Sequence, residues 1–169
     1  GFEKLYKKSE KILAREQRKL SRMQLHSNNY EKQKVKVARI HEKIANQRKD
    51  FIEKESTKLA NLYDIVCVED INLRNQAQSL KLGKSTNDNG FGLFRIRLQQ
   101  KLELQGKKFI KIDKWQPTST VCSCCGAYHK DVVNSLSVRS WTCPDCGSIH
   151  NRDENAAINI LNQGLLLLQ

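Results

Sequence analysis

Four cysteines form two Cys-x-x-Cys pairs that are separated by 17 residues. A loop of this kind presents both of its sulfurs to one metal ion, and two such loops supply the four thiolates that tetrahedral zinc prefers. A glycine follows each pair, as the tight turn behind such a loop requires. The spacing therefore predicts a structural zinc site made by Cys122, Cys125, Cys143 and Cys146.

Two disulfides are the alternative interpretation of the same four residues. The sequence has no secretory segment, and Cys67 would be left over in an apolar run. Cys124 also stays outside the set, because Cys122 and Cys125 have the required two-residue gap. Disulfides belong mainly to oxidising compartments, so these observations favour zinc.

Two acidic residues, Glu69 and Asp153, are candidates for a functional site. Glu69 directly follows the β-branched run 65–68, which predicts a buried strand, and ligands of open α/β sheets bind at the carboxyl ends of strands. Asp153 stands at a predicted helix start, where an N-cap is the simplest explanation when it is taken alone. Glu69 is thus the stronger candidate on residue pattern.

The first 60 residues predict a basic helical hairpin. Apolar residues recur at helical spacing over 2–23, the pattern breaks at 26–29, and a second helical pattern continues to Leu59, with Phe51 and Ile52 on its apolar face. This segment carries 17 basic and 8 acidic side chains. Lys32, Lys36, Arg39 and Lys43 cannot all lie on the buried stripe, which leaves them available for phosphates. Taken by itself, the hairpin could equally be a partner-binding coiled coil.

The remaining pattern predicts an α/β layer interrupted by the cysteine-containing segment. We expect a strand over 65–68, a mobile surface loop over 74–90, a helix over 91–105 and a strand over 109–112, joined by a right-handed crossover. A last helix begins near Asp153 with Ala157, Ile160 and Leu161 inward, and Gly164 closes it. No internal repeat is evident.

Charge and hydropathy restrict the partners. The net charge is +12, which favours polyanions such as nucleic acid, and no apolar run approaches the ~20 residues that span a bilayer. We therefore expect a soluble intracellular protein. Residue 1 is Gly1 and the single methionine is Met23, so we also expect a piece of a longer protein.

Three segments of the sequence carry a further signal: Val68-Glu69-Asp70-Ile71-Asn72, the two Cys-x-x-Cys-Gly loops, and Arg-Asp-x-Asn-Ala-Ala beginning at Arg152. Together they resemble the carboxyl-terminal part of the TnpB (OrfB) family, whose members are encoded by bacterial insertion sequences. The segment 41–51 also resembles the second hairpin helix of that family. The resemblance covers nearly the whole chain.

The resemblance implies a RuvC-type nuclease, with an RNase H-like fold and three carboxylates that hold Mg²⁺. Glu69 matches the second of these carboxylates and Asp153 the third, while the first lies upstream of the hairpin. Whether this chain is itself an enzyme is therefore left open. The resemblance further implies DNA and a guide RNA as partners, an upstream segment of the same protein, and a cytoplasmic, nucleoid-associated location in bacteria.

The expected fold class is α/β, a partial RNase H-like (RuvC-type) layer with an inserted zinc ribbon and an N-terminal basic antiparallel helical hairpin. We divide the chain into the hairpin (1–60), a strand–loop–helix–strand part (61–115), the ribbon (116–150) and a final helix (151–169). The resemblance implies that the loop after Glu69 is a lid and that the hairpin lies near the guide–target heteroduplex.

Two other functions remain open: a non-catalytic zinc-ribbon protein that binds or regulates nucleic acid, and a helical interaction protein. In the ribbon, Lys130, Arg139 and Trp141 could touch nucleic acid, although packing against the cysteine loops is the simpler role for Trp141.

Overall fold

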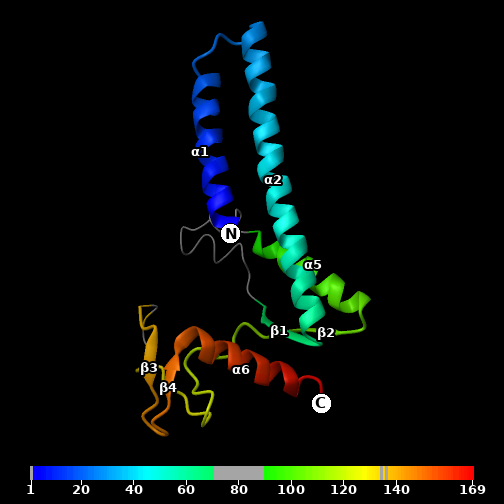
Figure 1. Ribbon diagram of the computed structural model, residues 1–169. Helices are drawn as coiled ribbons and strands as arrows, with labels where there is room; N and C mark the ends of the chain where they lie inside the picture. The colour runs from blue at the N-terminus through cyan, green and yellow to red at the C-terminus, as the bar shows by residue number, and fades with distance from the viewer. Residues whose placement is uncertain (1, 71–89, 134, 136) are drawn as a thin grey trace. The chain divides into compact units, whose positions relative to one another are not determined.

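The computed structural model describes residues 2–70, 90–133, 135 and 137–169, with only the backbone of residues 2–7 (Figure 1). The predicted loop at 74–90 lies outside these residues except for Gly90. The described residues fall into two compact units, 2–61 with 90–101, and 62–70 with the described part of 102–169. No helix in the described ranges is both long and apolar enough to cross a membrane.

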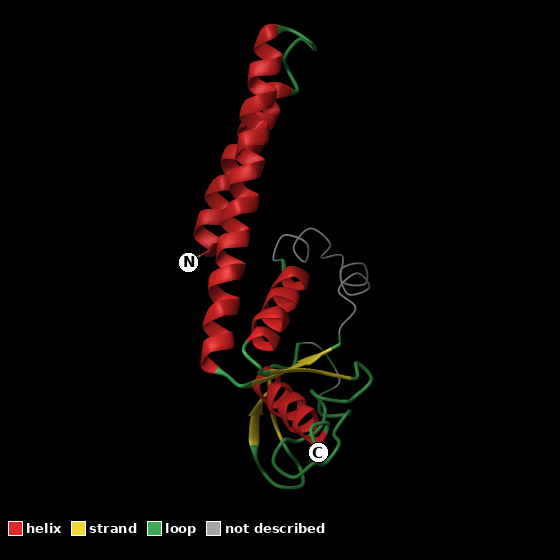
Figure 2. Cartoon of the chain, turned by 90° about the vertical axis from the view of Figure 1, so that its right-hand side faces the viewer, coloured by secondary structure: helices red, strands yellow, loops and turns green. Residues whose placement is uncertain are grey.

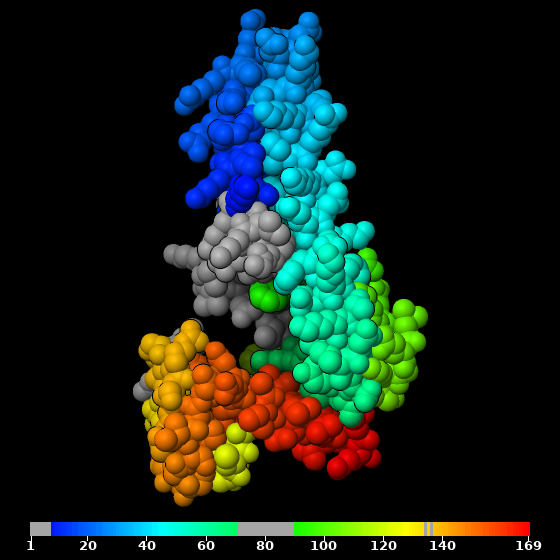
Figure 3. Space-filling model, in the orientation of Figure 1, coloured from blue at the N-terminus to red at the C-terminus, as the bar shows by residue number. Residues whose placement is uncertain are grey.

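The expected antiparallel hairpin is confirmed by helices α1 (Phe2–Leu20) and α2 (Asn28–Leu62), which run side by side (Figure 1). Atoms of the two helices lie against each other in the space-filling view (Figure 3). Ser27 starts α2, because its hydroxyl accepts a hydrogen bond from the Tyr30 N–H at 3.1 Å. Hydrogen bonds from Ser9 to Gln47 and from Gln33 to the buried Glu16 join the two helices.

The buried stripe of α2 consists mainly of small and branched side chains. Its buried residues are Gln33, Val37, Ile44, Ile52, Ser56 and Ala60. The four basic residues singled out above are all exposed, as expected, and Lys36 pairs with Glu16 at 3.0 Å. Phe51 was expected on the stripe but is 39% exposed, because the adjacent Ile52, which is 1% exposed, occupies the core position.

The second unit is built on two parallel strands, β1 (Ile65–Glu69) and β2 (Lys108–Ile112). In the sequence, helix α5 (Phe91–Leu104) lies between the two strands, and most of it belongs to the first unit. Their register pairs Ile65 with Lys108 and Glu69 with Ile112. Helix α6 (Arg152–Leu166) packs on this pair of strands (Figure 2). The predicted order of strand, helix and parallel strand is therefore confirmed.

The expected inner face of α6 is right only in part. Ile160 is half-buried, but Ala157 is exposed and Leu161 is 43% exposed, whereas the buried residues are Asn155, Asn159 and Gly164. The two asparagines are buried because their amides bond to the ribbon backbone, as described below. Gly164 lies inside the helix and does not end it, and a methyl group there would lie 2.8 Å from Cys67 Cβ.

Candidate metal centre

Two backbone loops of the same shape present the four cysteines. In the first, the Cys122 N–H donates to Ala127 O at 2.8 Å and the Gly126 N–H donates to Cys122 O at 2.9 Å. The second loop repeats both bonds at the same lengths, from Cys143 to Ser148 and from Gly147 to Cys143. The glycines have φ of 78° and 72°, a left-handed conformation that disfavours any residue with a side chain.

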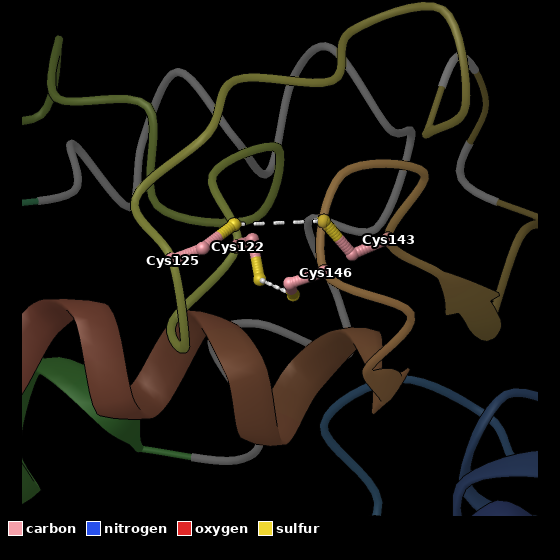
Figure 4. Close-up of side chains that lie close together, drawn as sticks. All are labelled: Cys122, Cys125, Cys143 and Cys146. Carbon is pink, nitrogen blue, oxygen red and sulfur yellow. Dashed lines mark hydrogen bonds between the residues drawn. The ribbon is translucent and has the colours of Figure 1, made fainter.

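The four sulfurs converge, as the spacing predicts (Figure 4). All lie within 4.8 Å of one another, and the pairs Cys122–Cys146 and Cys125–Cys143 are both 3.7 Å apart. Zinc–sulfur bonds of about 2.3 Å in a regular tetrahedron require sulfurs about 3.8 Å apart. A disulfide would bring two sulfurs to about 2.05 Å. The cluster therefore fits a metal ion such as zinc, and none of the four cysteines is in a disulfide.

Two histidines cross from one loop to the sulfur of the other. His150 Nε2, which follows the second loop, lies 3.1 Å from the sulfur of Cys122, and His129 Nε2, which follows the first, lies 3.3 Å from the sulfur of Cys143. A metal-bound thiolate only accepts hydrogen bonds, so each imidazole would donate from Nε2. Such outer contacts orient metal ligands and strengthen the site.

The remaining two cysteines have perturbed proton affinities. Hydrogen bonds from the Ser148 side chain and backbone lower the pKa of Cys146 to about 6. A backbone bond from Ala127 acts in the same direction on Cys125, but desolvation and the other three sulfurs outweigh it and raise the pKa of Cys125 to about 12. Four close thiols cannot all ionise unaided, and a bound divalent cation removes that conflict.

The two cysteine loops also correspond to each other in backbone pairing and in sequence spacing, although no internal repeat was expected. The bridge between Val121 and Tyr128 in the first loop matches the pairing of strands β3 (Ser140–Thr142) and β4 (Ile149–Asn151) in the second. His129 and His150 each follow the first cysteine of their loop by seven residues. That repeated spacing is the sequence signal by which both histidines could have been identified.

Trp141 forms the small core behind the cysteines. It is 5% exposed, with its ring centroid 4.8 Å from that of His150 and 5.9 Å from that of His129. Val133 completes the buried cluster with Cys122 and Cys143. The packing role expected for Trp141 is confirmed.

Cys124 is exposed and stays outside the four-sulfur group. It does, however, come close to Cys122 and His150, whose ligand atoms lie within 4.8 Å of its sulfur.

Helix α6 holds the first loop through two side-chain amides. Asn155 Oδ1 accepts from the Ser123 N–H at 2.9 Å, and Asn155 Nδ2 donates to Val121 O at 2.7 Å. Asn159 Nδ2 donates to Thr118 O and to Val121 O, both at 2.8 Å. These hydrogen bonds therefore attach the first cysteine loop to the helix that packs on the parallel strands.

The two candidate carboxylates belong to this same unit. Glu69 ends β1, and partial burial raises its pKa. Asp153 lies in the first turn of α6, but Asn151 is the N-cap, since its side chain accepts from the N–H groups of Asp153 and Glu154. The capping role, which is the simplest explanation of Asp153 taken alone, therefore belongs to Asn151. Asp153 is exposed and lies 3.5 Å from Arg139, itself 72% exposed.

The structure does not link Glu69 and Asp153 by a hydrogen bond or an ion pair among the described residues. Helix α6 meets β1 near Gly164, eleven residues beyond Asp153, which is about 17 Å along a helix. Asp153 therefore lies at the ribbon end of α6.

Two protein-family models match parts of this chain, and several known proteins are similar to it. The family model described as "Cas12f1-like, TNB domain" matches residues 91–160, and the model described as "Probable transposase" matches residues 3–80. A "Putative RNA-guided DNA endonuclease" of Streptomyces pristinaespiralis is 40% identical over 153 residues, which cover 90% of this chain and 37% of that protein.

Two further relatives show the same partial coverage. The "Putative RNA-guided DNA endonuclease InsQ" of Escherichia coli K12 is 33% identical over 96% of this chain and 44% of its own length. The "TnpB-like protein L79" of Acanthamoeba polyphaga mimivirus is 29% identical over 95% of this chain and 30% of its length. This chain thus spans less than half of each relative. With both family models matching, the chain belongs to the TnpB family.

Proposed function

We propose that this chain contributes the carboxyl-terminal part of an RNA-guided DNA endonuclease with a RuvC-type, RNase H-like catalytic layer. Relatives named as RNA-guided DNA endonucleases support the activity. The observation that carries the proposal is the place of Glu69, a partly buried carboxylate at the carboxyl end of one of two parallel strands. DNA and a guide RNA are the proposed partners, in the bacterial cytoplasm at the nucleoid.

We assign the catalytic layer to residues 61–115 and 151–169. Its support is the packing of α6 on β1 and β2 after the chain returns from the ribbon, with Gly164 against Cys67. In this division residues 116–150 form the zinc ribbon and residues 1–60 the basic hairpin. The exposed lysines and arginines of α2 suit the phosphates of a nucleic acid that is read through its backbone.

The proposed chemistry is hydrolysis of a phosphodiester bond at Glu69 and Asp153, with a third carboxylate from residues outside this sequence. Carboxylate oxygens are the ligands that Mg²⁺ prefers, and Mg²⁺, when bound, would supply an activated water and charge stabilisation for the leaving oxygen. Partial burial makes the charge of Glu69 costly without a cation, which the raised pKa of Glu69 reflects. Asp153, exposed at the start of α6, remains accessible to such a cation.

We propose zinc as the ion held by the four cysteines. Its role is structural, because all four ligand positions are filled by protein sulfurs and none remains for a substrate.

The test is cleavage of plasmid DNA in Mg²⁺ with guide RNA and with the upstream segment of the protein supplied in trans. We expect Glu69→Ala and Asp153→Ala each to lower the cleavage rate by about 10²–10³-fold, the usual effect of removing one preorganised electrostatic group. Matched controls are Asp64→Ala, 88% exposed before the start of β1, and Glu154→Ala, exposed beside Asp153. Both controls should cleave at the wild-type rate.

Two outcomes would contradict the proposal. Cleavage that survives both site substitutions would mean that the carboxylates lie elsewhere. Salt-sensitive binding of nucleic acid with no cleavage in any arm would instead favour the non-catalytic nucleic-acid-binding module.

A further inference from the structure

A pocket of about 790 Å³ opens where the two parallel strands end, and neither the metal centre nor the proposed carboxylate pair uses it. Asp70, which follows β1, and the segment after β2 form part of its wall. Gln163 and Leu167, from the end of α6, complete the wall. The volume is that of an ordinary small-ligand site.

Trp115 lines this pocket and is 80% exposed, although it is the kind of side chain that proteins usually bury. A turn fixes its backbone, since Asp113 Oδ1 accepts from the Trp115 N–H at 2.9 Å and Asp113 O accepts from the Gln116 N–H at 3.2 Å. The indole is therefore carried on a defined turn and left open to water.

A positive charge accompanies the ring. Lys114 Nζ lies 4.9 Å from the centroid of the Trp115 ring, and Lys111 also lines the pocket. An exposed aromatic face beside a cation is the arrangement with which proteins bind single-stranded nucleic acid, through stacking of a base and attraction of the adjoining phosphate.

The rest of the wall suits the edge of a base better than a cluster of phosphates. The two lysines are balanced by Asp70 and Asp113, so the lining carries no net positive charge. Gln163 Oε1 is buried and has no hydrogen-bond donor among the described residues. An acceptor withdrawn from water in this way is satisfied by an amino group of a ligand.

We propose that this pocket binds one unpaired nucleotide, with its base stacked on Trp115, its amino group directed to Gln163, and its phosphate beside Lys114. The inference rests on the proposed function in taking nucleic acid as the partner. It adds a contact to the base itself, at the edge of the sheet where Glu69 ends its strand. Adenine and cytosine carry the required exocyclic amino group at the base-pairing edge, and thymine does not.

The two tryptophans of the chain make the test direct, because Trp115 is exposed and Trp141 is buried. Fluorescence of the full 169-residue chain is titrated with single-stranded oligo-dA, oligo-dC and oligo-dT at several salt concentrations. We expect quenching of the exposed tryptophan by oligo-dA and oligo-dC. Trp115→Ala should remove this quenching and weaken binding by about 5- to 150-fold, the range measured for the loss of one stacked base.

Substitutions separate the three contacts. Trp115→Phe should keep part of the affinity, and Lys114→Ala should lower the salt slope by about one ion. Gln163→Leu should remove the preference for adenine and cytosine over thymine, which Gln163→Glu, still an acceptor, should retain. The matched control is Tyr128→Ala, since Tyr128 is an aromatic residue of the ribbon that is 55% exposed.

The outcomes distinguish this inference from the function on which it rests. Salt-sensitive binding with equal affinity in Trp115→Ala and Tyr128→Ala would overturn the pocket and leave the proposed function standing. Absence of any binding by the wild type would overturn both. Protection of Trp115 from acrylamide in the free chain would overturn the pocket too, because protein would then already cover it.

Discussion

Replacing His150 with phenylalanine removes a hydrogen-bond donor from the cysteine cluster and keeps an aromatic ring in its place. His150 Nε2 lies 3.1 Å from the sulfur of Cys122, and both residues are buried. The ring also lies 4.8 Å from that of Trp141, a contact that phenylalanine can preserve. The substitution therefore tests the hydrogen bond with little change in packing.

The expected size follows from that one bond. A hydrogen bond to a charged group contributes about 1.5–3 kcal/mol, which corresponds to a factor of about 10 to 150 in binding. Loss of an outer-shell partner at other metal sites costs a similar 10- to 100-fold. We thus expect His150→Phe to weaken zinc binding about 10- to 150-fold. His129→Phe should cost less, since His129 Nε2 lies farther from its sulfur, at 3.3 Å, and is also 3.5 Å from an Asp145 oxygen, which can compete for the same proton.

The assay is competition for zinc with a chromophoric chelator, read together with the charge-transfer bands of the cobalt-substituted chain and the rate of cysteine alkylation. His150→Gln restores an N–H donor and should recover much of the affinity. His41→Phe is the matched control, since His41 is an exposed residue of α2 that contacts Gln17 at 3.2 Å.

Zinc affinity of His150→Phe within about threefold of the wild type would refute the reasoning. So would an equal loss in His150→Phe and His150→Gln, because the ring and not the donor would then be responsible.

Gly164→Ala places a methyl group against Cys67 Sγ, its nearest neighbour, and 2.8 Å from Cys67 Cβ. Overpacking should therefore lower the free energy of unfolding by about 1–3 kcal/mol in chemical denaturation, with partial recovery in the double variant with Cys67→Ala, which removes the sulfur. An unchanged free energy of unfolding in Gly164→Ala would contradict this prediction, because the helix and the strand would then move apart at no cost. Glu16 has its pKa lowered from 4.5 to about 2, first by the hydrogen bond from Gln33 and then by Lys36. The stabilisation that this lowered pKa reflects is present above pH 4.5 and is lost as the pH falls toward 2, so Glu16→Gln should flatten the loss of hairpin stability in that window, and an unchanged melting profile would contradict it.

Local patterns were sufficient to predict most elements of the fold. Helical periodicity predicted the hairpin, and the β-branched run before Glu69 predicted a strand that the structure pairs in parallel with β2. The two-residue gaps predicted the convergence of the four cysteines, because such a loop determines its own geometry.

The errors occur where side chains bond to distant backbone. Asn155 and Asn159 are polar, so periodicity placed their face of α6 outward, but their amides are satisfied by a segment more than 30 residues earlier. Asn151, one residue before the helix, is the N-cap, the role that was the alternative for Asp153 taken alone. His129 and His150 were missed because each acts on a sulfur of the opposite loop, and only the folded ribbon brings these partners together.

Hydrogen bonds from the side-chain amides of α6 to the carbonyls of Val121 and Thr118 couple the cysteine-containing ribbon to the helix that packs on the strand of Glu69. If the ribbon unfolds when zinc is scarce, two buried side-chain amides of α6 lose their hydrogen-bond acceptors. Loss of the proposed zinc would then destabilise the packing of α6 on β1 and β2. The proposed cleavage activity should therefore fall when zinc is limiting, even at saturating magnesium.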